Sequence, residues 1–245
     1  MNVIKREDEK LLPLDQIERA SEFEGFAPED FDLFAAPEIG ERMPLLKQRV
    51  TPKLKQIATA LTARMGEIVE ESMFPHVAQH LRRSVNPPVE TWAAFARTAR
   101  SYKPVVHVRV GVSLEKLRVV VFVEDYADDK LLFAKNLARN ASGISAWCRH
   151  HPTIVAYDIL DKDGQPCHGR TLTATALRAF AARMQKIKGQ HARFGIAFDR
   201  SHPVVANGPE CLDAVIEAAR QLRPLYDCGR PGFKYEYTPE PVVVA

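Results

Sequence analysis

Residues 73–112 contain a concentration of side chains that can bind anions or transfer protons. The segment holds three of the eight histidines, an adjacent pair of arginines, one of the two tryptophans and a Tyr-Lys dipeptide. Guanidinium groups form forked hydrogen bonds with phosphate, and aromatic rings stack on bases. We therefore take the following residues as candidate ligand contacts: His76, His80, Arg82, Arg83, Asn86, Trp92, Arg100, Tyr102, Lys103, His107 and Arg109.

His76 and His80 lie four residues apart on a helix that we expect over residues 75–83, so their side chains should share one face. Two histidines at this spacing can hold a metal ion, as in the H-E-x-x-H motif. Val77 follows His76 in place of the glutamate, and the segment offers no third ligand. The sequence favours a structural or anion-binding role for this pair, and it indicates no metal centre and no cofactor.

Arg82 and Arg83 fall in the last turn of the same expected helix, where cations complement the helix dipole or form a phosphate fork. His107 and Arg109 alternate with valines, which places both on one face of a strand. That face is either a solvent-facing side of the sheet or the floor of an anion site. The walls of such a site would include Arg82, Arg83 and Lys103.

The aromatic and connecting residues of the segment also have two interpretations. Trp92 and Tyr102 can stack on a base, although burial is the commoner outcome for tryptophan. Asn86 precedes two prolines and is expected to fix a loop through side-chain hydrogen bonds. Arg97 and Arg100 are three residues apart, so they should share one face of a helix expected over residues 90–100.

Metal-ligating side chains also gather later in the chain. A zinc site would use Cys148, His150, His151, Cys167 and His168. Their spacing matches no recognised zinc motif, so the sequence favours exposed loop residues here.

An acidic run at residues 158–163 is similar to a calcium-binding loop. Asp158, Asp161 and Asp163 precede Gly164, but the glutamate expected at the twelfth loop position is missing, so a turn is favoured. The phosphate loop, the dinucleotide-binding glycine motif and the serine nucleophile elbow are absent from the sequence.

The hydrophobic pattern predicts the elements that must position these residues. Helices are expected from Pro28, over residues 38–70 with a kink or break at Pro52, and over 75–83, 90–100, 128–149, 171–187 and 209–222. Residues 105–112 and 117–124 alternate or are β-branched and should form an antiparallel hairpin, with further strands over 153–160 and 192–198. This order indicates an α+β fold with a mainly antiparallel sheet built around the hairpin.

The run MFPHVAQHLRRSVNPPVETW and the segment RSYKPVVHVRV that follows it resemble the signature of the YktB-like family of bacterial proteins. The upstream segment FAPEDFDLF is also similar to the start of that family, so the resemblance covers residues 23–125 well. It implies a cytosolic α/β protein of unassigned function, and it supplies no catalytic residues.

Charge is distributed unevenly along the 245 residues. The formal net charge is +3, but residues 1–30 carry −5 and residues 82–118 carry +6. We expect an acidic extension over 1–22 that can lie over the basic surface, a single domain over 23–230 and a Pro-rich tail over 231–245. The chain has no apolar run long enough to cross a membrane and no signal-peptide pattern, so we expect a cytoplasmic protein.

Three hypotheses about function follow from these residues. The first is a binding module for a phosphate-bearing ligand, either a nucleic acid or a nucleotide-like metabolite, held by the basic surface of residues 76–109. The second is an enzyme acting on a small anionic substrate, with His76, His80 or His107 as acid or base. The third is a structural polar network that only holds the fold together.

Overall fold

The computed structural model describes residues 23–81 and 83–238. Its strands are β1 (Phe74–Val77), β2 (Glu90–Ala96), β3 (His107–Ser113), β4 (Lys116–Val123), β5 (Val155–Leu160), β6 (Pro166–His168) and β7 (Ala192–Asp199). Its α-helices are α2 (Pro28–Asp32), α3 (Ile39–Leu45), α4 (Thr51–Val69), α5 (Lys130–Arg139), α6 (Ala141–His150), α7 (Ala174–Lys186), α8 (Pro203–Ala206) and α9 (Gly208–Tyr226). Short helical segments are η1 (Leu33–Ala35), η2 (Leu46–Val50) and η3 (Asp227–Gly229).

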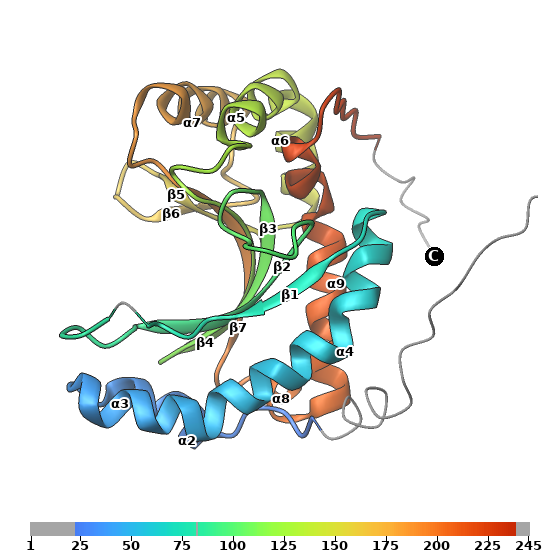
Figure 1. Ribbon diagram of the computed structural model, residues 1–245. Helices are drawn as coiled ribbons and strands as arrows, with labels where there is room; N and C mark the ends of the chain where they lie inside the picture. Colours follow the sequence, from blue (N-terminus) through green and yellow to red (C-terminus); the bar gives the residue numbers. More distant parts are fainter. Residues whose placement is uncertain (1–22, 82, 239–245) are drawn as a thin grey trace, which may run out of the picture.

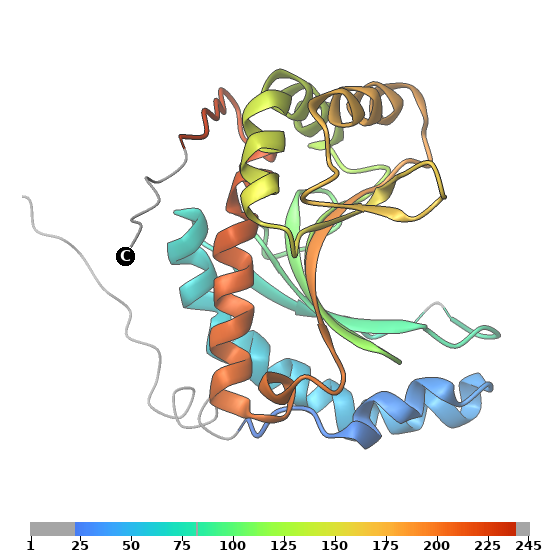
Figure 2. The same cartoon turned by 180° about the vertical axis from the view of Figure 1, so that it is seen from behind.

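A seven-stranded antiparallel sheet forms the centre of the fold, in the order β1-β2-β3-β4-β7-β5-β6. Helices α4 and α9 run side by side along the curved sheet, and α5, α6 and α7 gather at one end (Figures 1 and 2). The predicted α+β class is confirmed. The fold leaves part of the opposite sheet face without a covering helix (Figure 1).

Strand alternation divides the sheet into two chemically different faces. Val108, Val121 and Phe194 are neighbours in register, and all three are buried. Phe194 packs against Phe133 of α5 and Phe180 of α7, with ring centres 6.3 and 6.1 Å apart. This face therefore forms the core beneath the helices. We call the other face, where the intervening residues point, the outer face.

The expected hairpin and the two later strands are confirmed. Strands β3 and β4 pair over residues 107–122, and β5 and β7 lie within the segments 153–160 and 192–199. Strand β6 was not predicted, because three residues are too short to show a period. The helix expected over 171–187 is α7, and Thr173 caps it by accepting a hydrogen bond from the amide of Ala176.

Two expected helices are strands instead. The sequence predicts helices over residues 75–83 and 90–100. These segments contribute β1 and β2 instead, and the two strands pair with each other. The alanine-rich sequence of β2 favours a helix locally, and pairing with β3 overrides that preference. Ala94 lies between His76 and Arg109 in register, so a small side chain is needed there to leave room for the guanidinium.

The long helix expected over residues 38–70 is confirmed, together with its disturbance near Pro52. A π-helical segment, η2, joins α3 to α4, and Pro52 lies in the first turn of α4. Proline has no N–H to donate to the preceding turn, which the wider π-helical turn accommodates. Helix α4 then ends at Glu70, which adopts a left-handed conformation with φ of 53°.

The helix expected over 128–149 is two helices, which meet at Asn140. The Asn140 side chain donates to the carbonyl of Asn136 at 2.8 Å and accepts from the amide of Tyr235 at 2.9 Å. The C-terminal segment therefore packs on this junction, and residues 231–238 form no strand. The expected acidic extension over 1–22 and the tail beyond residue 238 lie outside the described residues.

Candidate functional site

His107 and Arg109 share the outer face of β3, as their alternation predicts. His107 is completely buried, and its Nδ1–H donates to the carbonyl of Val105 at 2.8 Å. Its Nε2 accepts from Nε–H of Arg109 at 2.8 Å, so the ring is the neutral Nδ1–H tautomer. Burial, and then the charge of Arg109, lower the pKa of His107 well below its ordinary value.

Arg109 is the centre of a buried cluster on this face. Its guanidinium carbon lies 3.6 Å from the ring centre of Phe122, 4.6 Å from that of Trp92 and 5.3 Å from that of Tyr102. It also donates a hydrogen bond to the carboxylate of Glu124. Burial lowers the pKa of Arg109, and the Glu124 charge opposes this shift. We call this cluster the Arg109 network: Trp92, Tyr102, His107, Arg109, Phe122 and Glu124.

His76 and His80 do not share a helix face, because no helix forms there. His76 lies on β1, where its Nε2–H donates to the carbonyl of Thr98 at 2.9 Å. His80 lies in the β1–β2 connection, and its Nε2 is 3.1 Å from the hydroxyl of Thr91. Burial, and then the charge of Arg83, lower the pKa of His80 to about 4. Each ring is therefore held by a separate hydrogen bond.

The remaining candidates are not gathered around His107. Arg83 and Asn86 are exposed in the β1–β2 connection, so Arg83 does not end a helix. Arg82 lies outside the described residues. Arg100 and Lys103 are exposed in the β2–β3 connection, and Arg97, expected beside Arg100 on a helix, pairs instead with Asp129 at 2.7 Å. The candidates that the structure brings together are His76, His80, Trp92, Tyr102, His107 and Arg109.

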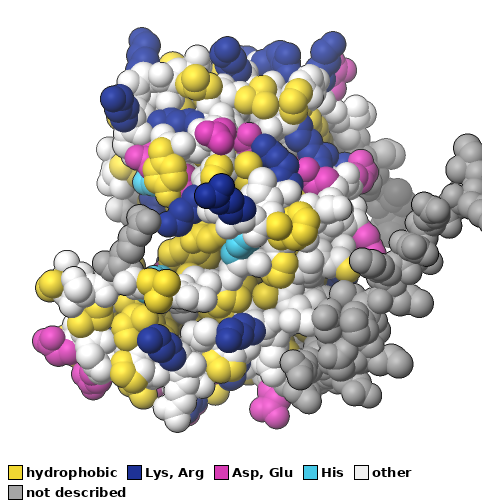
Figure 3. Space-filling model, in the orientation of Figure 1, with side chains coloured by type: hydrophobic (Ala, Val, Ile, Leu, Met, Phe, Trp, Pro, Cys, Tyr) yellow, Lys and Arg dark blue, Asp and Glu magenta, His cyan; other side chains and the backbone are white. Residues whose placement is uncertain are grey.

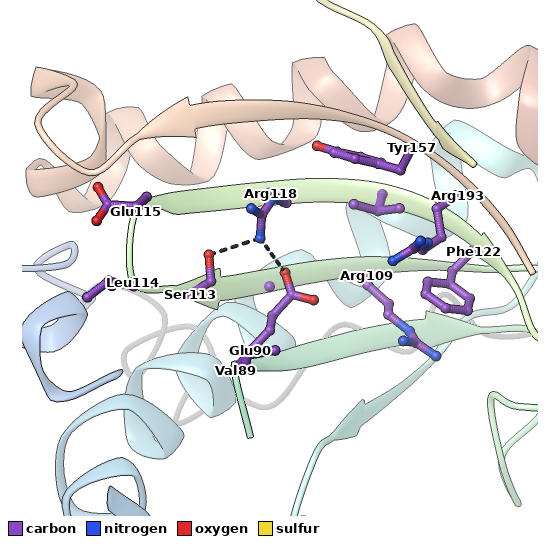
Figure 4. Close-up of a pocket in the computed structure, with 12 residues that line it drawn as sticks. Val89, Glu90, Arg109, Ser113, Leu114, Glu115, Arg118, Phe122, Tyr157 and Arg193 are labelled. Atoms are coloured by element: carbon purple, nitrogen blue, oxygen red, sulfur yellow. Dashed lines mark hydrogen bonds and ion pairs between the residues drawn. The ribbon is translucent and has the colours of Figure 1, made fainter. Parts of the chain in front are cut away.

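A cavity of about 400 Å³ opens beside Arg109 on the outer face, and we call it the sheet pocket (Figure 4). Arg109, Arg118 and Arg193 line it from the neighbouring strands β3, β4 and β7. The floor includes the small residues Gly111 and Val120. The other lining residues are Val89, Glu90, Ser113, Leu114, Glu115, Phe122 and Tyr157.

Each arginine of the sheet pocket already has a carboxylate partner. Arg109 pairs with Glu124, as described above. Arg118 donates to Glu90 at 3.1 Å and to the Ser113 hydroxyl at 2.9 Å (Figure 4). Arg193 forms a forked pair with Asp158, with N–O distances of 2.6 to 3.2 Å. These pairs fix the orientation of the guanidinium groups before any ligand binds.

Tyr157 brings an unsatisfied hydroxyl group to the same pocket. Its Oη is buried and has no hydrogen-bond partner among the residues that the structure describes. Burial raises the pKa of Tyr157, so the phenol keeps its proton. The Tyr157 ring lines the sheet pocket, whereas its hydroxyl oxygen is shielded from solvent there.

Comparison with known proteins identifies the family of this chain. A family model described as a domain of unknown function, DUF1054, matches residues 26–226. The chain belongs to the DUF1054 family. A UPF0637 protein of Bacillus velezensis is 30% identical over 208 residues, which cover 82% of this chain and 94% of the relative. A UPF0637 protein of Oceanobacillus iheyensis is 29% identical over 211 residues, covering 82% of this chain and 95% of the relative.

The family membership expected from residues 23–125 is thus confirmed and extends to residue 226. The matched part of the DUF1054 chain contains the Arg109 network and every residue that lines the sheet pocket. Within the described residues, no helix combines the length and the apolar composition needed to cross a membrane.

Sequence reasoning missed Arg118, Tyr157 and Arg193 as site residues. Arg118 and Arg193 each interrupt an apolar strand on the same side as Arg109, and this periodic signal is present in the sequence. The strand order that brings β7 next to β4 is not visible in the sequence, so the three arginines could not be placed together.

The other candidate ligand groups of the DUF1054 chain do not converge on an ion. Cys148 and Cys167 are buried, whereas His150 and His168 are exposed. Within the described residues, these side chains do not bring three ligand atoms together. The acidic run forms the expected turn, in which Asp161 accepts hydrogen bonds from the amides of two later residues.

The buried neutral ring of His107 predicts that this protein loses stability below about pH 6.5. An unfolded chain takes up a proton near the ordinary histidine pKa of 6.5, whereas the folded chain does so only at lower pH. The free energy of unfolding should therefore fall by up to about 1.4 kcal/mol per pH unit as the pH decreases below that value. Urea unfolding over this range measures the slope. His107→Gln should have a shallower slope than the wild type, and equal slopes would contradict this assignment. The exposed control His150→Gln should keep the slope of the wild type.

Proposed function

We propose that this DUF1054 protein binds a small phosphate-bearing metabolite, of nucleotide-like size, in the sheet pocket. The observation that carries this proposal is that arginine side chains from three neighbouring strands line one cavity. The cavity volume of about 400 Å³ lies within the range of small-molecule sites. Guanidinium groups suit phosphate because their planar fork matches two phosphate oxygens.

The rest of the lining supports a ligand with both an anionic and a planar part. Phe122 and Tyr157 offer ring faces on which a base can stack. The Ser113 hydroxyl lines the pocket and can turn its proton from the Lys116 carbonyl to a phosphate oxygen.

A nucleic acid is less well supported as the ligand. Nucleic-acid surfaces present a continuous basic stripe. On the face shown in Figure 3, Lys and Arg side chains are scattered among apolar and acidic ones. The basic residues of segment 82–118 do not share one surface. Arg83 lies in an exposed connection, Arg109 is buried in the Arg109 network, and Arg118 lines the sheet pocket.

The enzyme hypothesis is also less well supported, because a general acid or base must reach its substrate. Both ring nitrogens of His107 are occupied inside the protein. The geometry around His76, Trp92 and Tyr102 instead supports a structural role, in which the network holds the β2–β3 connection against the sheet. Arg109 belongs to both the network and the sheet pocket, so the two roles meet at this residue.

Glu90 should compete with the ligand for Arg118. Its carboxylate lies over Gly111, where an added Cβ would be 2.8 Å from Oε1, and it accepts a hydrogen bond from Arg118. Glu90→Gln removes the negative charge and keeps the shape, so it should bind adenosine monophosphate a few times more tightly than the wild type. Calorimetric titration measures this change. The control Glu217→Gln removes a carboxylate from the exposed face of α9 and should bind as the wild type does. Weaker binding by Glu90→Gln would place the ligand elsewhere.

Titration of the full chain with adenosine monophosphate tests the proposed function. We expect saturable binding at one site and much weaker binding of adenosine, which lacks the phosphate. A single-stranded RNA oligonucleotide, titrated between about 50 mM and about 200 mM salt, separates the two ligand classes. Salt-dependent RNA binding without binding of the monophosphate, or equal affinity for adenosine and its monophosphate, would overturn the proposal.

A further inference from the structure

Glu124, Asp125 and His191 form a compact group of metal-ligating side chains next to the sheet pocket. One ligand atom from each residue lies within 4.8 Å of the other two. Glu124 and Asp125 directly follow β4, and His191 directly precedes β7, which pairs with β4 up to Val123. Register therefore holds two carboxylates and one imidazole together at the end of this strand pair.

The hydrogen bonds around His191 leave two electron pairs facing each other. The backbone N–H of Asp125 donates to Nδ1 of His191 at 3.2 Å, so this nitrogen carries no proton. Oε2 of Glu124 lies 3.4 Å from the same nitrogen, and a carboxylate oxygen only accepts. Among the described residues, no donor reaches this oxygen. Two acceptors at this distance repel each other unless Nδ1 takes up a proton or a metal ion binds both.

The burial and charge of the group also favour a cation. Glu124 is only 8% exposed, and its other oxygen, Oε1, is held by Arg109. After that ion pair, the group of two carboxylates, one imidazole and one guanidinium retains one net negative charge. A hydrogen-bond partner such as Arg109 fixes the orientation of a ligating carboxylate and leaves the other carboxylate oxygen free to bind the ion.

We propose that Glu124, Asp125 and His191 bind a divalent transition-metal ion, with Zn²⁺ or Mn²⁺ as the best chemical match. Two carboxylates and one imidazole suit these ions, and a ring nitrogen disfavours Mg²⁺ and Ca²⁺. On metal binding, Nδ1 of His191 exchanges its hydrogen bond from the Asp125 amide for a bond to the ion. Three protein ligands leave coordination positions open for water or for a ligand oxygen.

The proposed metal site adjoins the sheet pocket through Phe122 and Arg109. Phe122 lines the pocket and packs edge-to-face on His191, with ring centres 5.7 Å apart. Arg109 lines the pocket and contacts Glu124. A bound ion would therefore lie at the Arg109 end of the pocket and could take a phosphate oxygen of the ligand. This second step rests on the proposed function, whereas metal binding itself does not.

Calorimetric titration of the chelator-treated full chain with Zn²⁺ tests the site, and Co²⁺ absorption reports its ligands. We expect one saturable site that is weakened about tenfold or more in His191→Gln and in Asp125→Asn. The exposed control His168→Gln should bind as the wild type does. Glu124 is left unchanged in these variants because it neutralises the buried Arg109. The absence of a saturable site, or equal binding by His191→Gln and the wild type, would overturn the metal site.

The connection to the pocket has its own measurement. Adenosine monophosphate should bind more tightly to the Zn²⁺-loaded wild type than to the chelator-treated protein, and His191→Gln should lose this difference. Equal affinity in both states would overturn the connection. Zn²⁺ binding without any binding of the monophosphate would overturn the proposed function and leave the metal site intact.

Discussion

Replacing Arg109 by Met should lower the free energy of unfolding by about 3–5 kcal/mol, the usual cost of removing one partner from a buried ion pair. The variant leaves the buried carboxylate of Glu124 without its cation and Nε2 of His107 without its donor. Met retains much of the contact with Trp92 and Phe122, so the lost stability reports the polar partners rather than a cavity. Urea unfolding at neutral pH, with the midpoint and the slope both recorded, measures it.

Two variants show whether burial is the reason for this cost. Arg220→Met breaks a pair whose two side chains are 61% and 54% exposed, so its effect should be about 1 kcal/mol or less. The double variant Arg109→Met with Glu124→Gln should be more stable than Arg109→Met alone, because no unpaired charge remains buried. If Arg109→Met costs no more than Arg220→Met, the Arg109 network does not stabilise the fold in the way described.

Arg118→Gln should weaken the binding of adenosine monophosphate by about 10- to 100-fold, the range expected for lost hydrogen bonds to a charged group. Arg118 lies at the centre of the sheet pocket and is only part-buried, with a side-chain exposure of 29%. The fold should tolerate this substitution, because Glu90 is partly exposed to water and the Ser113 hydroxyl keeps its hydrogen bond to the Lys116 carbonyl. Calorimetric titration of the variant and the wild type measures the change.

The matched control for this prediction is Arg220→Gln. It removes the same charge from the exposed face of α9, where Arg220 pairs only with Glu217 on the same helix. Its affinity for the monophosphate should equal that of the wild type. A similar loss in both variants would mean that net charge, rather than the sheet pocket, determines binding.

The hairpin, the later strands and the long helix could be predicted because their signals are local. Alternating valines define β3, and apolar residues at three- and four-residue steps define the buried side of α4. Strands β1 and β2 could not be predicted in this way. Pro75 and the alanines of β2 do not favour strands, and it is the pairing of β2 with β3 and of β1 with β2 that makes them.

The candidate site could be predicted only in part, for the same reason. Alternation placed His107 and Arg109 together, and Trp92 and Tyr102 do lie beside them. The predicted grouping of His76 with His80 depended on a helix that does not form. The sheet pocket needs the strand of Arg193 beside the strand of Arg118, and this pairing of segments distant in sequence depends on the position of β7 in the sheet.

Amide chemical shifts during titration with adenosine monophosphate test the central claim most directly, because they locate the ligand as well as detect it. We expect saturable shifts at Gly111 and Ser113 on the floor and rim of the sheet pocket, and at Arg118 between them. Adenosine should produce much smaller shifts at the same concentration. Shifts confined to residues outside the sheet pocket, or no saturable shifts at all, would contradict the assignment of this pocket as a phosphate-ligand site.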